Sequence, residues 1–318
     1  MLIPILSLLA GFLLLMWSAD AFTDNGAKIA RIFNISPLVI GLLIFGFGTS
    51  APEMLVSGLA AYDGHPEMSI GNAFGSNIFN IGLVLGVTAI ILPITVEKSV
   101  LKKEWLFLFL STLIVGFLLL DGFLSFTDGL ILISLLTLFL INVFRESKKN
   151  NLTDSDSDSD SDSLKSNSQK NGNGRTWLFL IVSLIILVSS ARLVVWGGTS
   201  LALSFGVSDL IIGLTVVALG TSLPELAVSI SSALKKQHQM VIGNIIGSNL
   251  FNTLGVLAIP GLILPFQIPT EVMGRDFFFM LMFTLLVLIL SMRLKISRFG
   301  GFILLTALTI YLYQLFWI

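Results

Sequence analysis

The stretch NISPLVIGLLIFGFGTSAPEMLVS, residues 34–57, decides the fold because it occurs twice. Shifted by 172 positions, it lies without a gap on GVSDLIIGLTVVALGTSLPELAVS, residues 206–229. The same shift lays MSIGNAFGSNIFNIGLVLGV, residues 68–87, on MVIGNIIGSNLFNTLGVLAI, residues 240–259. An ungapped match across two apolar segments and their connection indicates that the chain is internally duplicated.

The composition is typical of a protein embedded in lipid. Of the 318 residues, 55% are hydrophobic and only 12% are charged, whereas soluble domains carry about 25% charged residues. A spanning helix needs roughly 20 mostly apolar residues, and the N-terminal segment lacks the basic flank of a cleaved signal peptide. We therefore predict an all-α integral membrane protein with ten transmembrane helices, near residues 2–18, 35–61, 69–93, 105–120, 123–143, 177–203, 208–233, 240–264, 277–292 and 300–317.

The basic residues predict how these spans are oriented. All 18 Lys and Arg residues except Arg192 and Arg275 fall in the loops after the odd-numbered spans. Loops rich in Lys and Arg face the cytoplasm, so both termini are predicted to lie outside. Each half holds five spans, an odd number, so the second half enters the membrane from the opposite side. This is an inverted repeat, an architecture of many secondary transporters.

Three segments follow from this organisation: a first five-helix repeat at 1–144, a linker at 145–176 and a second repeat at 177–318. The linker is polar and low in complexity, so we expect a disordered cytoplasmic spacer. Its alternating Asp-Ser run, residues 154–163, has two further interpretations, weak calcium binding or phosphorylation. It lacks the glycine turn and bidentate glutamate of an EF-hand loop, so no regulatory site is predicted there.

Two buried carboxylates are the candidates for chemistry. Glu53 and Glu225 lie centrally in their predicted spans, where a charge costs at least a few kcal/mol and is by default functional. Each follows a proline, which removes a helical hydrogen bond and frees the carbonyl four residues earlier, here that of Gly48 or Gly220. The alternative is a protonated glutamate that makes an interhelical hydrogen bond.

Hydroxyl and amide groups accompany each glutamate at the same spacing in both halves. Such residues in membrane helices often serve only packing, but their repetition beside the glutamates favours ligands. Oxygen ligands suit hard cations such as Ca²⁺, which takes 6–8 of them, and the chain has no cysteine for soft metals. The predicted cation site comprises Thr49, Ser50, Glu53, Ser76, Asn80, Thr221, Ser222, Glu225, Ser248 and Asn252.

The doubled GTS-x-PE and GN-xx-GSN-xx-N motifs resemble those of the sodium/calcium exchanger family of the cation/calcium antiporter superfamily, especially its short prokaryotic members. The resemblance covers nearly the whole chain and implies a prokaryotic cytoplasmic (inner) membrane. It implies ion coordination by the ten residues named above, and it implies that spans 1 and 6 slide against the other eight to alternate access. Some members carry aspartate at one of positions 80 and 252, where this chain has asparagine at both.

The function predicted on this basis is secondary active antiport of Ca²⁺ against Na⁺ by alternating access, and the alternative is Ca²⁺/H⁺ exchange on the same scaffold. A passive channel is disfavoured by the inverted repeat. A membrane enzyme is disfavoured because no nucleophile–base arrangement is present. No prosthetic group is predicted, and no basic stripe suits nucleic acid. The expected partners are the transported Ca²⁺ and Na⁺ ions and the lipid bilayer.

Overall fold

The computed structural model describes residues 2–155, 166–205 and 218–317. This part of the chain is almost entirely helical, with two small two-stranded sheets. Eight helices in it are long and apolar enough to cross a membrane. Large hydrophobic side chains such as Leu13, Phe117 and Phe299 are more than two-thirds exposed, as expected where lipid rather than water surrounds the protein. The prediction of an all-helical membrane protein is confirmed.

The first half of the chain begins with a long helix and continues as several broken ones. Short π-helical segments (η) interrupt the α-helices. Its elements are α1 (Leu2–Ile32), α2 (Pro37–Ile40), η1 (Gly41–Phe45), α3 (Gly46–Tyr62), α4 (Pro66–Phe79), η2 (Asn80–Leu85), α5 (Gly86–Ile91), β1 (Ile94–Thr95), α6 (Lys98–Val100), η3 (Leu101–Trp105), α7 (Leu106–Leu118), β2 (Phe123–Leu124) and α8 (Phe126–Ser155).

The second half repeats this order. Its elements are α9 (Ser166–Ser204), α11 (Ala218–Thr221), α12 (Leu223–Leu234), α13 (His238–Leu250), η5 (Phe251–Val256), α14 (Ala258–Ile263), β3 (Phe266–Gln267), η6 (Val272–Phe277), α15 (Phe278–Ser291), β4 (Lys295–Ile296) and α16 (Arg298–Trp317). Many of these elements begin 172 positions after their counterparts in the first half, to within one residue. Strand β3 follows β1 at this distance, and β4 follows β2.

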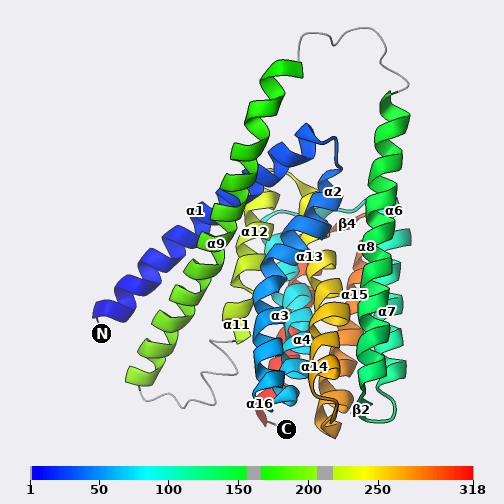
Figure 1. The fold of residues 1–318 in the computed structure, drawn as a ribbon. Coiled ribbons are helices and arrows are strands. Elements are labelled where there is room, and N and C mark those ends of the chain that lie inside the picture. The colour runs from blue at the N-terminus through cyan, green and yellow to red at the C-terminus, as the bar shows by residue number, and fades with distance from the viewer. Residues whose placement is uncertain (1, 156–165, 206–217, 318) are drawn as a thin grey trace.

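The two small sheets join the halves. Strand β1 pairs antiparallel with β4, so that Ile94 faces Ile296, and β2 pairs antiparallel with β3, so that Leu124 faces Phe266. Each pair has one residue from each half of the chain. Adding 172 to Ile94 gives position 266, and subtracting 172 from Ile296 gives position 124, so exchanging the halves converts the first pair into the second. Labels β4 and β2 lie at opposite ends of the bundle (Figure 1).

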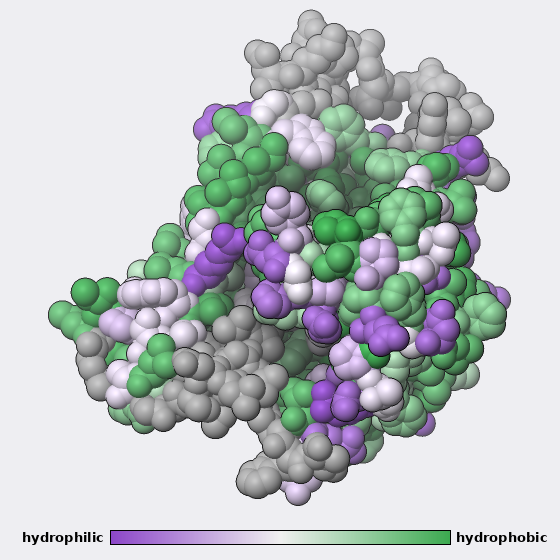
Figure 2. Space-filling model, turned by 60° about the horizontal axis from the view of Figure 1, so that its bottom comes forward, coloured by the Kyte–Doolittle hydropathy of each residue, from purple (hydrophilic) through white to green (hydrophobic). Residues whose placement is uncertain are grey.

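Helices α1 and α9 lie side by side and form one edge of the molecule, while the remaining helices make a compact bundle beside them (Figure 1). Two hydrophobic cores correspond to this division. The larger one fills the bundle around Phe74, Leu250 and Phe283, and the smaller one packs α1 and α9 against η1 and α12 through Phe22, Phe45 and Leu187. Viewed from the lower end, hydrophilic residues gather across the middle of the face and hydrophobic residues cover much of the flanks (Figure 2).

Several predicted spans differ in length from the helices observed. Helix α1 continues past residue 18 to Ile32, because aspartates lower helix propensity only slightly and do not end a helix. Asp20 and Asp24 on this extension pair with Lys235. Span 105–120 corresponds to α7, which continues η3 and α6, so the uninterrupted helical run begins at Lys98. Span 208–233 lies partly outside the described residues.

The helices also extend into the predicted linker. Helix α8 continues to Ser155 and α9 begins at Ser166, since adding residues to an existing helix costs far less than starting one. The remainder of the Asp-Ser run lies outside the described residues.

Candidate functional site

The ten predicted ligands lie on two pairs of helices, one pair from each half. Helix α3 carries Thr49, Ser50 and Glu53, and the α4–η2 junction carries Ser76 and Asn80. In the second half the equivalent positions lie on α11, α12, α13 and η5. All are buried except Thr221, which is partly exposed. The structure therefore places nine of these ten polar side chains in the interior of an apolar protein.

The proline beside each glutamate has different effects in the two halves. Helix α3 continues through Pro52 without a break. In the second half, α11 ends at Thr221 and α12 starts at Leu223, with Pro224 in its first turn and Ser222 between them. Since proline has no N–H to donate, it is tolerated in a first turn, whereas in α3 it deprives the carbonyl of Gly48 of its usual partner. The predicted opening of the helix is visible only in the second half.

Glycines bring the two halves into direct backbone contact at the site. A Cβ atom placed on Gly46 would lie 2.8 Å from the Cα of Gly247, and one on Gly243 would lie 2.9 Å from the Cα of Gly41. Real Cβ atoms do not approach backbone this closely, so α13 can pack on η1 and α3 only because these positions are glycine. Gly71 and Gly75, the counterparts of Gly243 and Gly247 in the first half, have no such neighbour among the described residues.

This close packing places hydroxyl groups from both halves together. The Oγ1 atom of Thr49 donates a hydrogen bond to the carbonyl of Phe45 at 2.9 Å and lies 3.3 Å from Oγ of Ser248. The hydroxyls of Thr49 and Ser50 also face the carboxylate of Glu225, although neither makes a hydrogen bond of good geometry with it. Helices α3 and α13 therefore contribute oxygens to one common space.

Several site atoms are buried with no hydrogen-bond partner among the described residues. Buried polar atoms in proteins are nearly always paired, and leaving one unpaired costs about 1–3 kcal/mol. A cation accounts for such oxygens because it accepts their lone pairs, while the amide nitrogens need an acceptor such as water. The unpartnered atoms are Oγ of Ser50, Oε2 of Glu53, Oδ1 and Nδ2 of Asn80, Oγ of Ser222, both carboxylate oxygens of Glu225, and Oδ1 and Nδ2 of Asn252.

The two carboxylates are the charged components of the site. Glu53 and Glu225 are each only 1% exposed and are close enough for their charges to repel each other. No Lys or Arg in the described part of the chain forms an ion pair with either. Two buried negative charges without a counter-charge are strongly unfavourable, so the site requires positive charge from outside the protein.

The donor set limits what that positive charge can be. Among the described residues, no three His, Cys, Asp or Glu side chains gather to hold a metal ion. A bound ion would therefore depend on the two carboxylates together with hydroxyl, amide and carbonyl oxygens. These residues fit a hard cation such as Ca²⁺ or Na⁺.

Two asparagines that are not among the ten predicted ligands lie directly behind them. Asn72 donates from Nδ2 to the carbonyl of Glu53 at 3.2 Å and to Oγ of Ser57 at 3.0 Å. Asn244 donates in the same way to the carbonyl of Glu225 at 3.3 Å and to Oγ of Ser229 at 3.0 Å. Asn72 and Asn244 are 172 positions apart, so they occupy the same place in the two repeats. This repetition is the sequence signal that could have identified the pair.

Asn72 also orients a predicted ligand. Its Oδ1 atom accepts a long hydrogen bond, 3.4 Å, from Oγ of Ser76. A hydroxyl that donates its proton to one neighbour directs its lone pairs elsewhere. Asn72 thus connects the backbone of Glu53 to the hydroxyl of Ser76 and holds α3 and α4 in register around the site.

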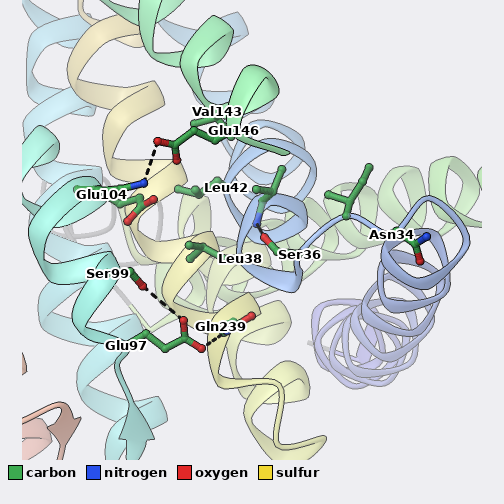
Figure 3. A pocket seen from close by; sticks show the side chains of 13 residues that line it. Asn34, Ser36, Leu38, Leu42, Glu97, Ser99, Glu104, Val143, Glu146 and Gln239 are labelled. Atoms are coloured by element: carbon green, nitrogen blue, oxygen red, sulfur yellow. Dashed lines mark hydrogen bonds and ion pairs between the residues drawn. The ribbon is translucent and has the colours of Figure 1, made fainter. Parts of the chain in front are cut away.

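Two of the cavities in the described part of the chain differ in how they relate to this cluster. One, of about 390 Å³, separates α9 from α3 and α12 and is lined by Pro52, Arg192, Thr221 and Pro224 among others, so it touches the site at Thr221. The other, of about 370 Å³, contains none of the predicted ligands. In this second cavity, Glu97, Glu104 and Glu146 surround an opening between helix ends (Figure 3).

The three carboxylates of the second cavity have different surroundings. Glu146 pairs with Lys103 at 2.8 Å, and Glu97 accepts from Gln239. Glu104 lies just before the apolar part of its helix. Burial raises its pKa to about 7.

Comparisons with known proteins agree with the sequence motifs. The family model described as "Sodium/calcium exchanger protein" matches residues 3–145 and 175–317. The chain is 41% identical to the putative antiporter CaxA of Alkalimonas amylolytica, over 99% of each chain. It is 36% identical to the inner membrane protein YrbG of Escherichia coli (strain K12), over 100% of this chain and 98% of YrbG.

Similarity extends to a solved structure. The sodium-calcium exchanger NCX_Mj, soaked with 10 mM Na⁺ and zero Ca²⁺, superposes with a TM-score of 0.84 at 35% identity, and the match covers 99% of each chain. Matches of this extent relate the entire chain, and not only its motifs, to these proteins.

Proposed function

Because this chain belongs to the sodium/calcium exchanger family, we propose that it exchanges Ca²⁺ for Na⁺ across a membrane by alternating access. The observation that carries the proposal is the cluster of buried, unpartnered oxygens around Glu53 and Glu225. The two carboxylates lack a basic partner, so ions from solution must neutralise them. Cations that compete for one set of carboxylates can exchange across a membrane when the site opens to one side at a time.

In this proposal, the hydroxyl, amide and carboxylate oxygens of the ten predicted residues bind the ions. One Ca²⁺ neutralises the charges of Glu53 and Glu225, and a group of Na⁺ ions can neutralise the same charges. Thr49 offers lone pairs because its proton is donated to the carbonyl of Phe45. Asn72 and Asn244 act one step further out, since they hold the backbone of each glutamate.

The proposed architecture is ten spans in two inverted five-helix repeats. It is supported by the family model, which matches two segments of equal length. It is also supported by the two small sheets, whose pairing is reproduced when the halves are exchanged and which lie at opposite ends of the bundle (Figure 1). An exchange of halves that also exchanges the two ends is what an inverted repeat requires.

The chain is an integral membrane protein, and we place both termini outside and the connection between the halves in the cytoplasm. The distribution of Lys and Arg supports this orientation. Both chain ends lie toward one end of the molecule, and the end of α8 and start of α9 lie at the other (Figure 1). YrbG, a relative, is named an inner membrane protein, and we propose the same membrane here.

Flux measurements in reconstituted vesicles test the proposal. Vesicles loaded with Na⁺ and diluted into Na⁺-free medium with Ca²⁺ should accumulate Ca²⁺, and dissipating the Na⁺ gradient should stop uptake. Uptake that ignores Na⁺ but follows an imposed pH gradient would instead indicate Ca²⁺/H⁺ exchange. Ca²⁺ movement without any counter-ion would indicate a channel. Vesicles holding the Glu53→Gln variant provide the background rate.

A further inference from the structure

An ion pair ties the α1–α9 pair to the bundle at one end. The ammonium of Lys235, at the end of α12, lies 3.2 Å from Oδ1 of Asp20 and 2.9 Å from Oδ1 of Asp24, both on α1. Lys235 also donates a hydrogen bond to the backbone carbonyl of Asp20 at 2.9 Å, and the hydroxyl of Ser231 donates to the carboxylate of Asp20 at 2.5 Å. We call this set of four residues the first latch.

The internal repeat contains the same pair with its charges exchanged. A shift of 172 positions places Asp20 of α1 on Arg192 of α9, and Asp63, which follows α3, on Lys235. The acidic Asp20 thus corresponds to a basic residue, and the basic Lys235 corresponds to an acidic one, so the Asp20–Lys235 and Arg192–Asp63 pairs are both neutral. Helix α3 ends at the lower end of the bundle and α12 at the upper end (Figure 1). Arg192 and Asp63 are therefore the equivalent pair at the opposite end, which we call the second latch.

The second latch is open in this structure. Arg192 and Asp63 are both exposed, and neither forms an ion pair within the described part of the chain. An unpaired arginine inside a membrane span is costly, and such residues normally have a partner. The cavity that Arg192 lines places it level with Pro52 and Val56 of α3.

The position of Arg192 measures how far the second latch is from closing. Asp20 contacts Ser231, whose counterpart in the first half is Leu59. Moving Arg192 from the level of Val56 to that of Leu59 or Asp63 requires a shift of roughly 5–10 Å along α3, at 1.5 Å per residue. The same shift of α1 and α9 together carries Asp20 away from Lys235, so one displacement opens the first latch as it closes the second.

We propose that Asp20–Lys235 and Arg192–Asp63 are alternative latches, each of which stabilises one of the two access states. The inference rests on the alternating access proposed above. With the orientation proposed there, the first latch is cytoplasmic and the conformation described here is held by it. The latches are unequal, because Ser231 and Asp24 strengthen the first, whereas their counterparts Leu59 and Trp196 add nothing ionic to the second. The conformation with the first latch closed is thus the favoured one.

Cross-linking tests the geometry in the full-length chain, which has no native cysteine. The double variants Asp20→Cys/Lys235→Cys and Asp63→Cys/Arg192→Cys are reconstituted and treated with a short bifunctional thiol reagent in Na⁺, in Ca²⁺ and without either ion. Both pairs should cross-link, each should stop exchange, and the conditions that favour one should disfavour the other. If positions 63 and 192 never cross-link in any of the three conditions while positions 20 and 235 do, the inference is wrong.

Charge substitutions test whether the ion pairs set the balance between states. Arg192→Gln or Asp63→Asn should raise the apparent KM for Ca²⁺ at the cytoplasmic face by about two- to five-fold, the effect of losing an ion pair near a surface, and should not raise it at the outer face. Asp20→Asn should have the opposite effect. The exchanged pair Arg192→Asp/Asp63→Arg should restore the native values. Glu67→Gln and Lys236→Gln, exposed charges beside the latches, serve as matched controls.

The results separate this inference from the proposed function. A native chain that fails to exchange Ca²⁺ for Na⁺ contradicts the proposed function, whatever the cross-links show. A native chain that exchanges both ions, combined with variants that raise KM equally at both faces, contradicts only the latches.

Discussion

The hydroxyl oxygen of Thr49 lies 3.3 Å from that of Ser248, although 199 residues separate them in the chain. This contact joins α3 of the first half to α13 of the second inside the candidate site. If both hydroxyls bind one ion, the variants Thr49→Val and Ser248→Ala should each weaken Ca²⁺ affinity by about two- to ten-fold, the effect of losing a neutral polar contact.

A double-mutant cycle measures whether the two hydroxyls act together. We expect the double variant to lose clearly less affinity than the product of the single losses, because residues that share a ligand are not additive. Losses in vesicle uptake assays that multiply without any coupling would show that the two groups act separately.

Neutralising either carboxylate should abolish Ca²⁺ transport. Glu53→Gln and Glu225→Gln keep the size of the side chain but remove one of the two charges that oppose a divalent cation. Removing one partner from a buried charge interaction costs about 3–5 kcal/mol, so uptake at low Ca²⁺ should fall by about a hundredfold or more. Glu271→Gln, at an exposed position, is the matched control. Transport near the native rate in either site variant, with the protein correctly inserted, would refute the assignment.

Asn72 should affect ion affinity more than overall stability. Replacing it with leucine removes its bonds to the Glu53 carbonyl and to the hydroxyls of Ser57 and Ser76. We expect the KM for Ca²⁺ to rise about three- to ten-fold with turnover near native. Asn77→Leu on the same helix breaks bonds to Thr253 and Met280 instead and should lower Tm without changing KM. Equal KM changes in the two variants would reduce Asn72 to a packing residue.

The glycine contact between the halves should not tolerate a methyl group. In Gly46→Ala the new Cβ would meet backbone atoms of Gly247 and Ser248 at 2.8–2.9 Å. Backbone cannot move aside as a flexible side chain can, so we expect a loss of about 1–3 kcal/mol of stability and weaker ion binding. Gly58→Ala, whose Cβ would lie 3.5 Å from a side-chain atom of Ile259, is the control in the same helix. Thermal unfolding in detergent compares the two.

Glu104 should make stability depend on pH. Its pKa is raised by burial from 4.5 to about 7, so the folded protein retains this proton at pH values where the unfolded chain has lost it. Stability therefore decreases as pH rises from about 4.5 to about 7, and is constant above that range. Glu104→Gln removes this dependence and should stabilise the protein at pH 8 by on the order of 1–2 kcal/mol. A difference in Tm between variant and native protein that is the same at pH 5 and pH 8 would contradict this.

Most of the candidate site was predictable because its signals are local or repeated. An apolar run of 20 residues specifies a membrane helix wherever it occurs, and a lone glutamate within it stands out against that background. The duplication then doubles each signal, so that all ten predicted positions appear at matching places in both halves. The partners of Asn72 and Asn244 were not predictable, because they depend on which carbonyl and hydroxyl lie opposite these side chains on the neighbouring helix.

What the amino-acid sequence by itself determined is the class of protein, the extent of most helices, the duplication and the oxygen-rich residues of the site. The tertiary structure decided three further matters: that α3 continues through Pro52 whereas α12 starts beside Pro224, that Thr49 meets Ser248, and that Lys235 holds Asp20 while Arg192 has no partner in the described part of the chain. The last two of these depend on how far one helix is displaced along another. Helical periodicity fixes which face of a helix is apolar, but that displacement is set by packing between residues far apart in the chain.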